Sequence, residues 1–513
     1  MWSSILINIF LSTILVFAWR FLDWVWFKPR KMEKLLRKLG FQGNSYKILF
    51  GDAKEISEMG KKAYSKPLSL THDIVPRVFP FISNTIKKYG KNSFMWVGPR
   101  PNIFVTDVEL VKDVLNKYQT YQKNFNISNP IVKQFVKGLL RYEGEEWSQS
   151  RKQLKPAFNV NKLKEIVPTT QQCCEKILNE CEKMMSSDGS GVVDMAAQIE
   201  KFTASSVGCS LFRANYGATD KIFELVKEYA VLANPARPFS IPGEGYWPTK
   251  KNRRVKEIEE QIRCTVMDEI NKREKRDING VNEDPDLFDL ILEELHKNKN
   301  KRNHDRVINE TIGQAKVFYL ASFESSSNLL AWTMVVLSMH PDWQARAREE
   351  VFQVMGDRNE LQYDDLSQLK YVTMILYEVL RLYPPVIELS RIVEEETTLG
   401  GICIPKGTSI MLPTLLLHRD TEVWGEDAGE FKPERFAEGM AKATKGQAAF
   451  VPFGWGPRIC IGQNFALLVA KIFMAMLLRT FSFELSPTYA HAPCVTGFTI
   501  KPQFGAPIKL QKL

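Results

Sequence analysis

Apolar residues along the chain recur mostly with the 3.6-residue period of amphipathic helices. This period predicts helices over residues 108–118, 145–158, 161–185, 221–232, 253–276, 307–339, 343–355, 366–382 and 465–480. Shorter runs of strand-forming residues occur at 94–97, 103–106, 397–411 and 481–485. No internal repeat and no long Gly/Ser-rich or Pro-rich linker interrupts this pattern. We therefore expect one large, mainly α domain with small β-sheets.

The N-terminus has a different pattern. The 18 residues from Trp2 to Trp19 carry no charged side chain, and they precede Arg20, the segment FLDWVWF and a basic run that begins at Lys28. This length is near the minimum for a membrane-spanning helix, and tryptophans are typical of the lipid-water interface. A cleaved signal peptide would carry its positive charges before the apolar run. Here the positive charges follow the apolar run. This order predicts an uncleaved transmembrane anchor over residues 1–27, followed by a cytosolic domain over 28–513.

Composition and charge narrow the class of protein. The chain of 513 residues is 44% hydrophobic and 25% charged, as in ordinary globular proteins, and its net charge is +10. The basic residues are spread along the sequence without an aromatic-interleaved block, so a membrane surface or an acidic partner explains the charge better than nucleic acid. The charged tracts 271–276 and 297–306 are expected to be solvated.

Cysteine and histidine spacing excludes the common metal motifs. The eight cysteines form no CxxC pair, and the six histidines form neither HxxxH nor HExxH. The sequence therefore predicts neither a zinc site nor a disulfide framework. Each histidine is expected to be a surface residue or a hydrogen-bonded core residue.

One glycine-rich segment, FGWGPRICIG, carries candidate chemistry. It holds six specified positions, Phe453, Gly454, Gly456, Arg458, Cys460 and Gly462. A thiolate at the start of a helix is stabilised by backbone N–H groups, and the glycines allow the backbone to approach a large flat group. The alternative is a glycine-rich turn around a buried cysteine, but such a pattern arises by chance only about once in 10⁵ chains.

This segment resembles FxxGxRxCxG, the haem-binding loop of the cytochrome P-450 family. The resemblance implies haem b as cofactor, with the Cys460 thiolate as the proximal iron ligand. It also implies that Arg458 pairs with a haem propionate and that Phe453 and Gly462 form part of the haem-binding loop.

The order of two further motifs supports the resemblance. Glu378 and Arg381 match the family's ExxR, and Arg435 lies in FKPERF, between that motif and the cysteine loop. The resemblance implies that these three residues form a buried charge network with a structural role. Glu260 and Arg263 have the same spacing, and there we expect only a solvated pair.

Three more residues match positions that contact haem propionates in the family. Trp147 and Arg151 fit WxxxR, one helical turn apart, and Arg391 lies in VIELSRIV. The alternative for each is an interfacial tryptophan or a surface arginine.

The long apolar helix contains LASFESSSNLL, which corresponds to the family's AGxETT. Ala321 and Glu324 match, whereas Ser322, Phe323 and Ser325 depart from the pattern. The resemblance implies that Glu324 and Ser325 are catalytic and relay protons to dioxygen. The alternative is a serine-rich helix in which hydroxyls bond back to the carbonyl four residues earlier.

Further segments resemble the plant clan that contains secologanin synthase and triterpenoid and gibberellin oxidases, among them LPTLLLHRD and QNFALL. Two departures are Val469, where the clan usually has a polar residue, and a proline-rich hinge reduced to Lys28-Pro29-Arg30. The resemblance implies an apolar substrate site with walls from 125–139, 230–247, 318–325, 386–389 and 495–498.

The implied protein is a haem-thiolate monooxygenase of the endoplasmic reticulum membrane, with its catalytic domain in the cytosol. It would use O2, and electrons from NADPH through a cytochrome reductase, to hydroxylate or successively oxidise a terpenoid such as an iridoid or triterpenoid. Two alternatives remain open. One is an oxygen-independent haem-thiolate isomerase or dehydratase, and the other is a non-catalytic haem-binding membrane protein.

Overall fold

The structure is a computed structural model of the chain. It describes residues 2–123, 136–213, 216–233, 247–277, 285–297, 304–496 and 499–513. Three of the expected substrate walls, 125–139, 230–247 and 495–498, therefore lie wholly or partly outside the described residues.

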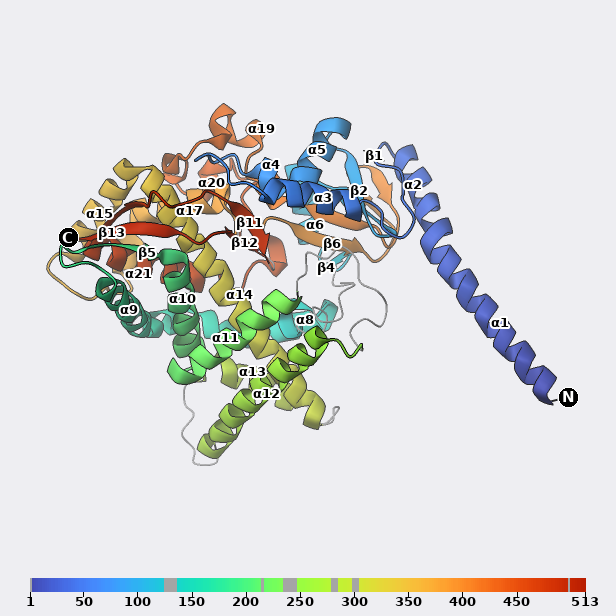
Figure 1. Ribbon diagram of the computed structural model, residues 1–513, viewed down its shortest axis with the longest axis horizontal. Coiled ribbons are helices and arrows are strands. Elements are labelled where there is room, and N and C mark those ends of the chain that lie inside the picture. The colour runs from blue at the N-terminus through green and yellow to red at the C-terminus, as the bar shows by residue number, and fades with distance from the viewer. Residues whose placement is uncertain are drawn as a thin grey trace.

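Helices dominate the fold (Figure 1). The first half of the chain contains α1 (Trp2–Leu22), α2 (Lys28–Lys38), α3 (Ala53–Tyr64), α4 (Val75–Val78), α5 (Pro80–Tyr89), α6 (Val108–Asn116), α8 (Gly144–Leu154), α9 (Val160–Lys183), α10 (Met195–Leu211), α11 (Tyr216–Ala233) and α12 (Lys250–Asp277). The second half contains α13 (Leu287–Lys297), α14 (His304–Met339), α15 (Pro341–Met355), α16 (Asp365–Gln368), α17 (Lys370–Leu382), α18 (Thr414–Leu417), α19 (Thr421–Trp424), α20 (Met440–Ala443) and α21 (Gln463–Thr480).

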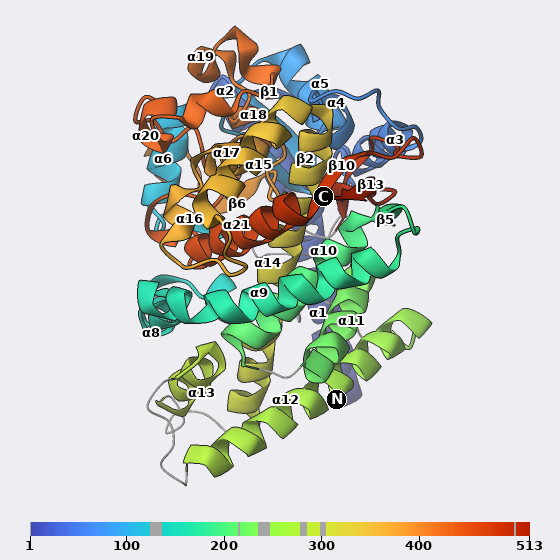
Figure 2. The same cartoon turned by 90° about the vertical axis from the view of Figure 1, so that its left-hand side faces the viewer.

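Helix α14 runs through the middle of the domain (Figure 2), and α10 and α21 pack against it. Its side chains from Leu329 to Leu337 are all buried, so this part of the helix is surrounded by protein on every side. His340-Pro341 ends the helix, because proline lacks the N–H that would continue it, and the proline then occupies the first turn of α15.

The strands form small sheets at the edges of the helical body. The largest sheet has the order β1-β2-β3-β9-β6-β4, made of β1 (Gln42–Gly43), β2 (Ser93–Val97), β3 (Arg100–Phe104), β9 (Ser409–Leu412), β6 (Leu389–Val393) and β4 (Tyr121–Lys123). The others contain β10 (Phe481–Leu485) with β13 (Pro507–Lys512) and β5 (Ser190–Asp194), β11 (Pro493–Thr496) with β12 (Thr499–Pro502), and β7 (Thr397–Leu399) with β8 (Ile402–Ile404). The prediction of a mainly α domain with small sheets is confirmed.

The N-terminal segment is a helix that projects from the domain (Figure 1). Helix α1 leads through a π-helical turn, Asp23–Phe27, directly into α2, and Pro29, which has no N–H to donate, lies just after the π turn. Its apolar side chains are exposed, and the helix over Ile5–Lys38 is long and apolar enough to cross a membrane. The expected boundary between residues 27 and 28 falls inside this continuous helix. Helix α21 passes the same length and hydropathy test, but it is a core helix, because 67% of it is buried.

Three predicted elements differ from the structure. The helix expected over 145–158 ends as α8 at Leu154 and is followed by a 3₁₀ turn over Lys155–Phe158. The helix expected over 366–382 divides at Leu369 into α16 and α17, and the run 397–411 forms three strands instead of one. Helix α10 was not predicted, because residues Phe202–Gly208 are buried without interruption and the sequence there shows no polar face. The tract 271–276 is helical, and Arg273 is buried between Asp286 and Asp289 at 2.7 and 2.6 Å, so the expectation that this tract is solvated is wrong there.

Three histidines that are far apart in the sequence meet in space. His72 Nε2 lies 3.0 Å from His340 Nε2, and His72 Nδ1 lies 3.0 Å from the hydroxyl of Tyr383. Tyr383 stacks on Trp332 of α14, whose ring also makes a T-shaped, edge-to-face contact with His491. All three histidines are hydrogen-bonded, but only His491 is fully buried, whereas His72 and His340 are half-buried. They form one cluster that ties residue 72 to the end of α14.

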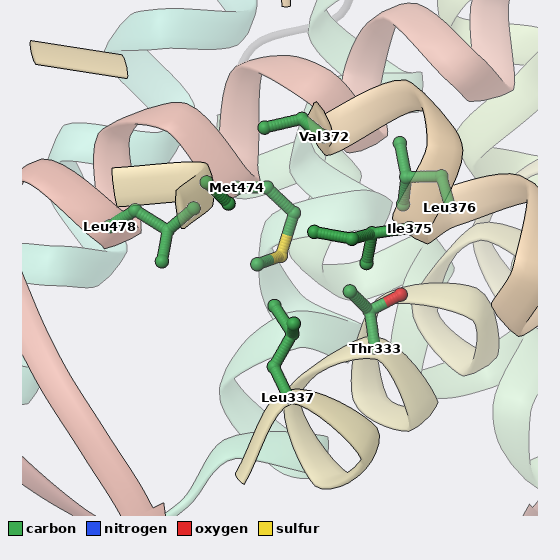
Figure 3. Close-up of a pocket in the computed structure, with 8 residues that line it drawn as sticks. Thr333, Leu337, Val372, Ile375, Leu376, Met474 and Leu478 are labelled. Atoms are coloured by element: carbon green, nitrogen blue, oxygen red, sulfur yellow. The ribbon is translucent and has the colours of Figure 1, made fainter. Parts of the chain in front are cut away.

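A small apolar gap lies between α14, α15, α17 and α21 (Figure 3). Its empty volume is about 160 Å³ and it is too narrow to admit a water molecule. Leu337, Ile375, Met474 and other apolar side chains line it, with Thr333 at one side. Since the Thr333 hydroxyl donates to the carbonyl of Leu329, the gap offers no free polar group and belongs to the core packing.

Candidate active site

The cysteine loop lies between the core and the start of α21. The Cys460 N–H donates to the Phe453 carbonyl at 2.8 Å, which closes the loop, and Gly462 caps α21. Gly454 and Gly456 have positive φ angles of 77° and 69°. A Cβ at Gly456 would also lie 2.7 Å from Asn116 Oδ1 and 2.9 Å from the Leu115 carbonyl. Glycine at 456 is therefore required both by conformation and by the contact with α6.

The Cys460 side chain is accessible to solvent, yet burial is the main influence on its pKa and raises it. The Gly462 N–H and the positive charges of Arg151 and Lys123 act in the opposite direction and lower the pKa. The surroundings of the loop therefore supply a local donor and positive charges that lower the pKa of Cys460, but burial raises this pKa by more. A positively charged metal ion is the kind of partner that would ionise such a thiol.

Arg458 of the same loop is buried and binds protein groups. Its guanidinium pairs with the Glu143 carboxylate and donates to the Tyr142 carbonyl at 3.1 Å. It also lies over the ring of Trp147, 4.5 Å from the ring centre. The predicted pairing with a haem propionate thus competes with Glu143, which sequence reasoning missed.

Four cationic side chains gather on the side of the loop near Glu143. Lys123 and Arg391 face each other across the pair β4 and β6, and Arg151 lies over Trp147, 5.8 Å from its ring centre. Burial, together with Arg458 and Arg391, lowers the pKa of Lys123 to about 7. Burial and the Arg458 charge likewise lower the pKa of Arg391 to about 10. The sequence analysis did not single out Lys123. Its place in the cluster follows from the pairing of Lys123 with Arg391 between β4 and β6, and the sequence alone does not reveal this pairing.

This cluster fits a group with two negative charges. Of its members, Arg458 has a carboxylate partner, whereas the Nε of Arg391 is buried without any hydrogen bond within the described residues. Buried donors of this kind are normally satisfied. Haem carries two propionates, and the residues that the sequence assigned to them, Trp147, Arg151, Arg391 and Arg458, lie together beside the Cys460 loop. The site therefore fits haem.

The structure also brings Glu378, Arg381 and Arg435 together. Arg381 donates to both carboxylate oxygens of Glu378, at 2.8 and 2.7 Å, and both side chains are fully buried. Its remaining N–H groups reach the carbonyls of His418, Ala428 and Glu430. Arg435 Nε lies 3.5 Å from Glu378, and its second partner is Asp427, whose pKa is lowered to about 2 by hydrogen bonds from Lys432 and Arg435.

Glu260 and Arg263 show that the spacing of the ExxR motif is by itself weak evidence for a buried ion pair. Glu260 is exposed on α12, and Arg263 donates to Asn309 instead of to Glu260. The same i, i+3 spacing thus gives a buried bidentate pair between Glu378 and Arg381, whereas no ion pair joins Glu260 to Arg263 among the described residues.

On α14, Glu324 and Ser325 point to different partners. Glu324 accepts a hydrogen bond from Thr499 of β12 at 2.9 Å, and burial raises its pKa. The Ser325 hydroxyl donates to the Ala321 carbonyl at 2.7 Å, which is the back-bonded arrangement weighed as the alternative. Phe323 is buried against Phe223 of α11, with ring centres 5.2 Å apart. No hydrogen bond joins Glu324 to Ser325 in the described part of the chain.

Comparison with known proteins places this site in a family. The cytochrome P450 family model matches residues 76–506. The chain is 48% identical over 500 residues to cytochrome P450 72A397 of Kalopanax septemlobus, covering 97% of this chain and 95% of the relative. It is 46% identical over 507 residues to secologanin synthase 2 of Catharanthus roseus, covering 98% and 96%. It is 45% identical over 518 residues to 7-deoxyloganic acid hydroxylase of Catharanthus roseus, covering 100% and 99%.

The match covers the cysteine loop, the buried Glu378 pair and the cationic cluster, and the relatives match nearly the whole chain. The expected cofactor of this fold is haem held by a cysteine thiolate, with NADPH serving only through a reductase. The chain belongs to the cytochrome P450 family and is a haem-thiolate monooxygenase.

Proposed function

We propose that this enzyme oxidises a plant terpenoid that carries an unactivated C–H bond, once or several times. The observation that carries the proposal is the accessible Cys460 thiol beside a cluster of four cations, of which Arg391 and Arg458 are buried, that suits haem. The relatives named for secologanin synthesis and 7-deoxyloganic acid hydroxylation support an iridoid, and a triterpenoid is the second choice.

In this proposal Cys460 ligates the iron, and Phe453 and Gly462 hold the loop that presents it. Arg391, Arg151 and Trp147 bind the propionates. Arg458 binds them too, by exchanging or sharing its contact with Glu143. Bound haem supplies the activation of dioxygen, and the thiolate donates electron density to the iron.

Glu324 and Ser325 would move protons to the oxygen site. Glu324 is suited to this because burial raises its pKa, so that it can hold a proton nearer to neutral pH than a solvated carboxyl can. Ser325 must release the Ala321 carbonyl before its hydroxyl can donate elsewhere. A rotation about one side-chain bond is sufficient, since serine lacks the methyl group that restricts threonine.

The membrane setting is part of the proposal. The apolar helix over Ile5–Lys38 would anchor the chain in the endoplasmic reticulum membrane, with the basic residues after Lys28 keeping the catalytic domain in the cytosol. An NADPH-cytochrome reductase would deliver the electrons there.

Reconstitution in microsomes with a plant reductase tests the function. Iridoids and triterpenoids are supplied one at a time, and products are identified by mass spectrometry with and without NADPH. We expect oxygenated products that require NADPH. Turnover without NADPH would instead identify an isomerase or dehydratase. Normal haem content without turnover of any terpenoid or consumption of NADPH would favour a non-catalytic haem protein.

A further inference from the structure

Glu143 joins three segments that carry the cationic cluster of the candidate active site. Its carbonyl accepts the Trp147 N–H at 3.2 Å in the first turn of α8, and its Oε1 accepts the backbone N–H of Lys123 in β4 at 3.1 Å. Its Oε2 pairs with the Arg458 guanidinium of the cysteine loop. One acidic residue therefore connects α8, β4 and the loop.

The position of Glu143 does not depend on Arg458 alone. The donor from Lys123 is a backbone N–H in a strand that pairs with β6, so no side-chain rotation removes it. The carbonyl of Tyr142, the residue before Glu143, accepts a second hydrogen bond from Arg458 at 3.1 Å. If Arg458 turned towards a haem propionate, the Glu143 carboxylate would keep its hydrogen bond from β4 and would stay beside the cationic cluster.

The hydrogen bonds of Glu143 fit the ionised carboxylate. Oε1 accepts from Lys123 and Oε2 accepts from Arg458, whereas protonation would place an O–H against one of these donors. Burial raises the pKa of Glu143, and the charges of Arg458, Lys123 and Arg391 act against this effect. The Arg458 side chain is only 1% exposed, so a neutral Glu143 would remove the anionic partner of a buried guanidinium.

Glu143 contributes a negative charge to a site that is otherwise positive. Among the described residues, the ion pairs of Arg151, Arg391 and Arg458 include a single carboxylate, that of Glu143. Ferric haem carries one more positive charge than ferrous haem. A fixed negative charge beside the haem site therefore favours the ferric form, and the cations around it favour the ferrous form.

We propose that Glu143 is a fixed counter-charge beside the haem, which lowers the reduction potential of the bound iron. The inference rests on the haem ligation by Cys460 that the proposed function also uses, and it is independent of which terpenoid is oxidised. It assigns the effect to the charge of Glu143 and not to its hydrogen bonds.

Redox titration of the haem-loaded, full-length enzyme, without substrate or reductase, tests the inference. The haem absorption spectrum reports the ferric and ferrous forms at each applied potential. Glu143→Gln keeps the size of the side chain and loses its charge. We expect the ratio of ferrous to ferric haem at a given potential to rise about 10-fold, which is an upward shift of about 60 mV. Glu145→Gln loses the same charge at an exposed position of α8 and should leave the potential unchanged.

Glu143→Asp separates the charge from the shape of the side chain, because it retains a carboxylate. Its potential should stay near that of wild type. An unchanged or lower potential in Glu143→Gln overturns the inference, and so does an equal upward shift in Glu143→Asp, which would assign the effect to geometry.

Haem content separates the remaining outcomes. If Glu143→Gln holds no haem while Glu143→Asp does, the carboxylate is needed to bind haem, and the role in setting the potential is wrong. If wild type itself binds no haem, the ligation by Cys460 is wrong, and the proposed function fails together with this inference.

Discussion

The Thr499 hydroxyl donates a hydrogen bond to Oε1 of Glu324 at 2.9 Å, although the two residues are 175 positions apart. Asn328, one turn along α14 from Glu324, donates to the same hydroxyl oxygen at 2.8 Å. This chain orients the Glu324 carboxyl, and the hydrogen bond from Thr499 lowers its pKa, against the larger effect of burial. The hairpin of β11 and β12 thus positions the Glu324 carboxyl of α14.

Replacing Thr499 by Val should weaken proton delivery. The Glu324 pKa rises further when the donor is lost, and the carboxyl is no longer held in one orientation. We expect about a 5-fold loss of product formed per NADPH consumed, as a hydrogen bond worth ~1 kcal/mol gives. Thr499→Ser retains the hydroxyl and serves as the control. If Thr499→Val and Thr499→Ser form the same amount of product per NADPH consumed, Thr499 does not act through Glu324.

Replacing Ser325 by Ala should divert electrons from product into hydrogen peroxide, because a hydroxyl of the proposed relay is removed. Ser327→Ala is a matched control, since the Ser327 hydroxyl also donates to a carbonyl of α14, that of Glu324 at 3.0 Å. Peroxide and product are measured for the same amount of NADPH. If Ser325→Ala and wild type give the same ratio, Ser325 is only the back-bonded hydroxyl seen in the structure.

Replacing Cys460 by Ser should abolish the absorption band that a thiolate ligand gives in the reduced carbon monoxide complex, because a serine hydroxyl does not replace the thiolate. Cys403→Ser, at an exposed cysteine of β8, should leave the band unchanged. Survival of the band in Cys460→Ser would overturn the ligand assignment.

Replacing Glu378 by Gln should destabilise the enzyme by about 3–5 kcal/mol, because Arg381 would remain as a buried charge without its carboxylate. The effect is read as a lower unfolding temperature and a lower yield of haem-loaded protein. Glu260→Gln, at the same motif spacing on α12, should change neither quantity, since Glu260 is exposed. Similar results for the two variants would contradict the structural role of the Glu378 network.

Acidification should destabilise the protein through its buried histidines. Burial lowers the pKa of His72 to about 3 and that of His491 to about 4, whereas both side chains have pKa values near 6.5 when unfolded. Each group therefore removes stability as pH falls from about 6.5 towards these values, by up to about 1.4 kcal/mol per pH unit. We expect unfolding temperature to fall between pH 7 and 5, and less steeply for His72→Gln. If the unfolding temperatures of wild type and His72→Gln fall in parallel with pH, His72 does not take up a proton when the protein unfolds.

Much of the fold was predictable from sequence because amphipathic periodicity is a local property. The helix over Gln463–Thr480 and the strand over Phe481–Leu485 correspond closely to prediction. Helix α10 was not predictable in this way, since burial on every side removes the polar face that reveals a helix. The resemblance located Cys460, Arg458 and Glu378, because each lies in a short motif of fixed spacing.

Partners distant in sequence could not be predicted. Nothing in the local sequence of Lys123 or Glu143 indicates that they lie beside Arg458, and nothing near Glu324 indicates Thr499.

The sequence by itself determined where most amphipathic helices form, which cysteine lies in a motif that resembles the family's haem-binding loop and that the N-terminus is apolar enough for a membrane, because these depend on residue type and short spacing. Only the tertiary structure decided which charges are paired. Glu378 and Glu260 share one motif, but the free energy of a carboxylate depends on its solvation and on the charges around it. Those surroundings come from distant segments that packing brings together.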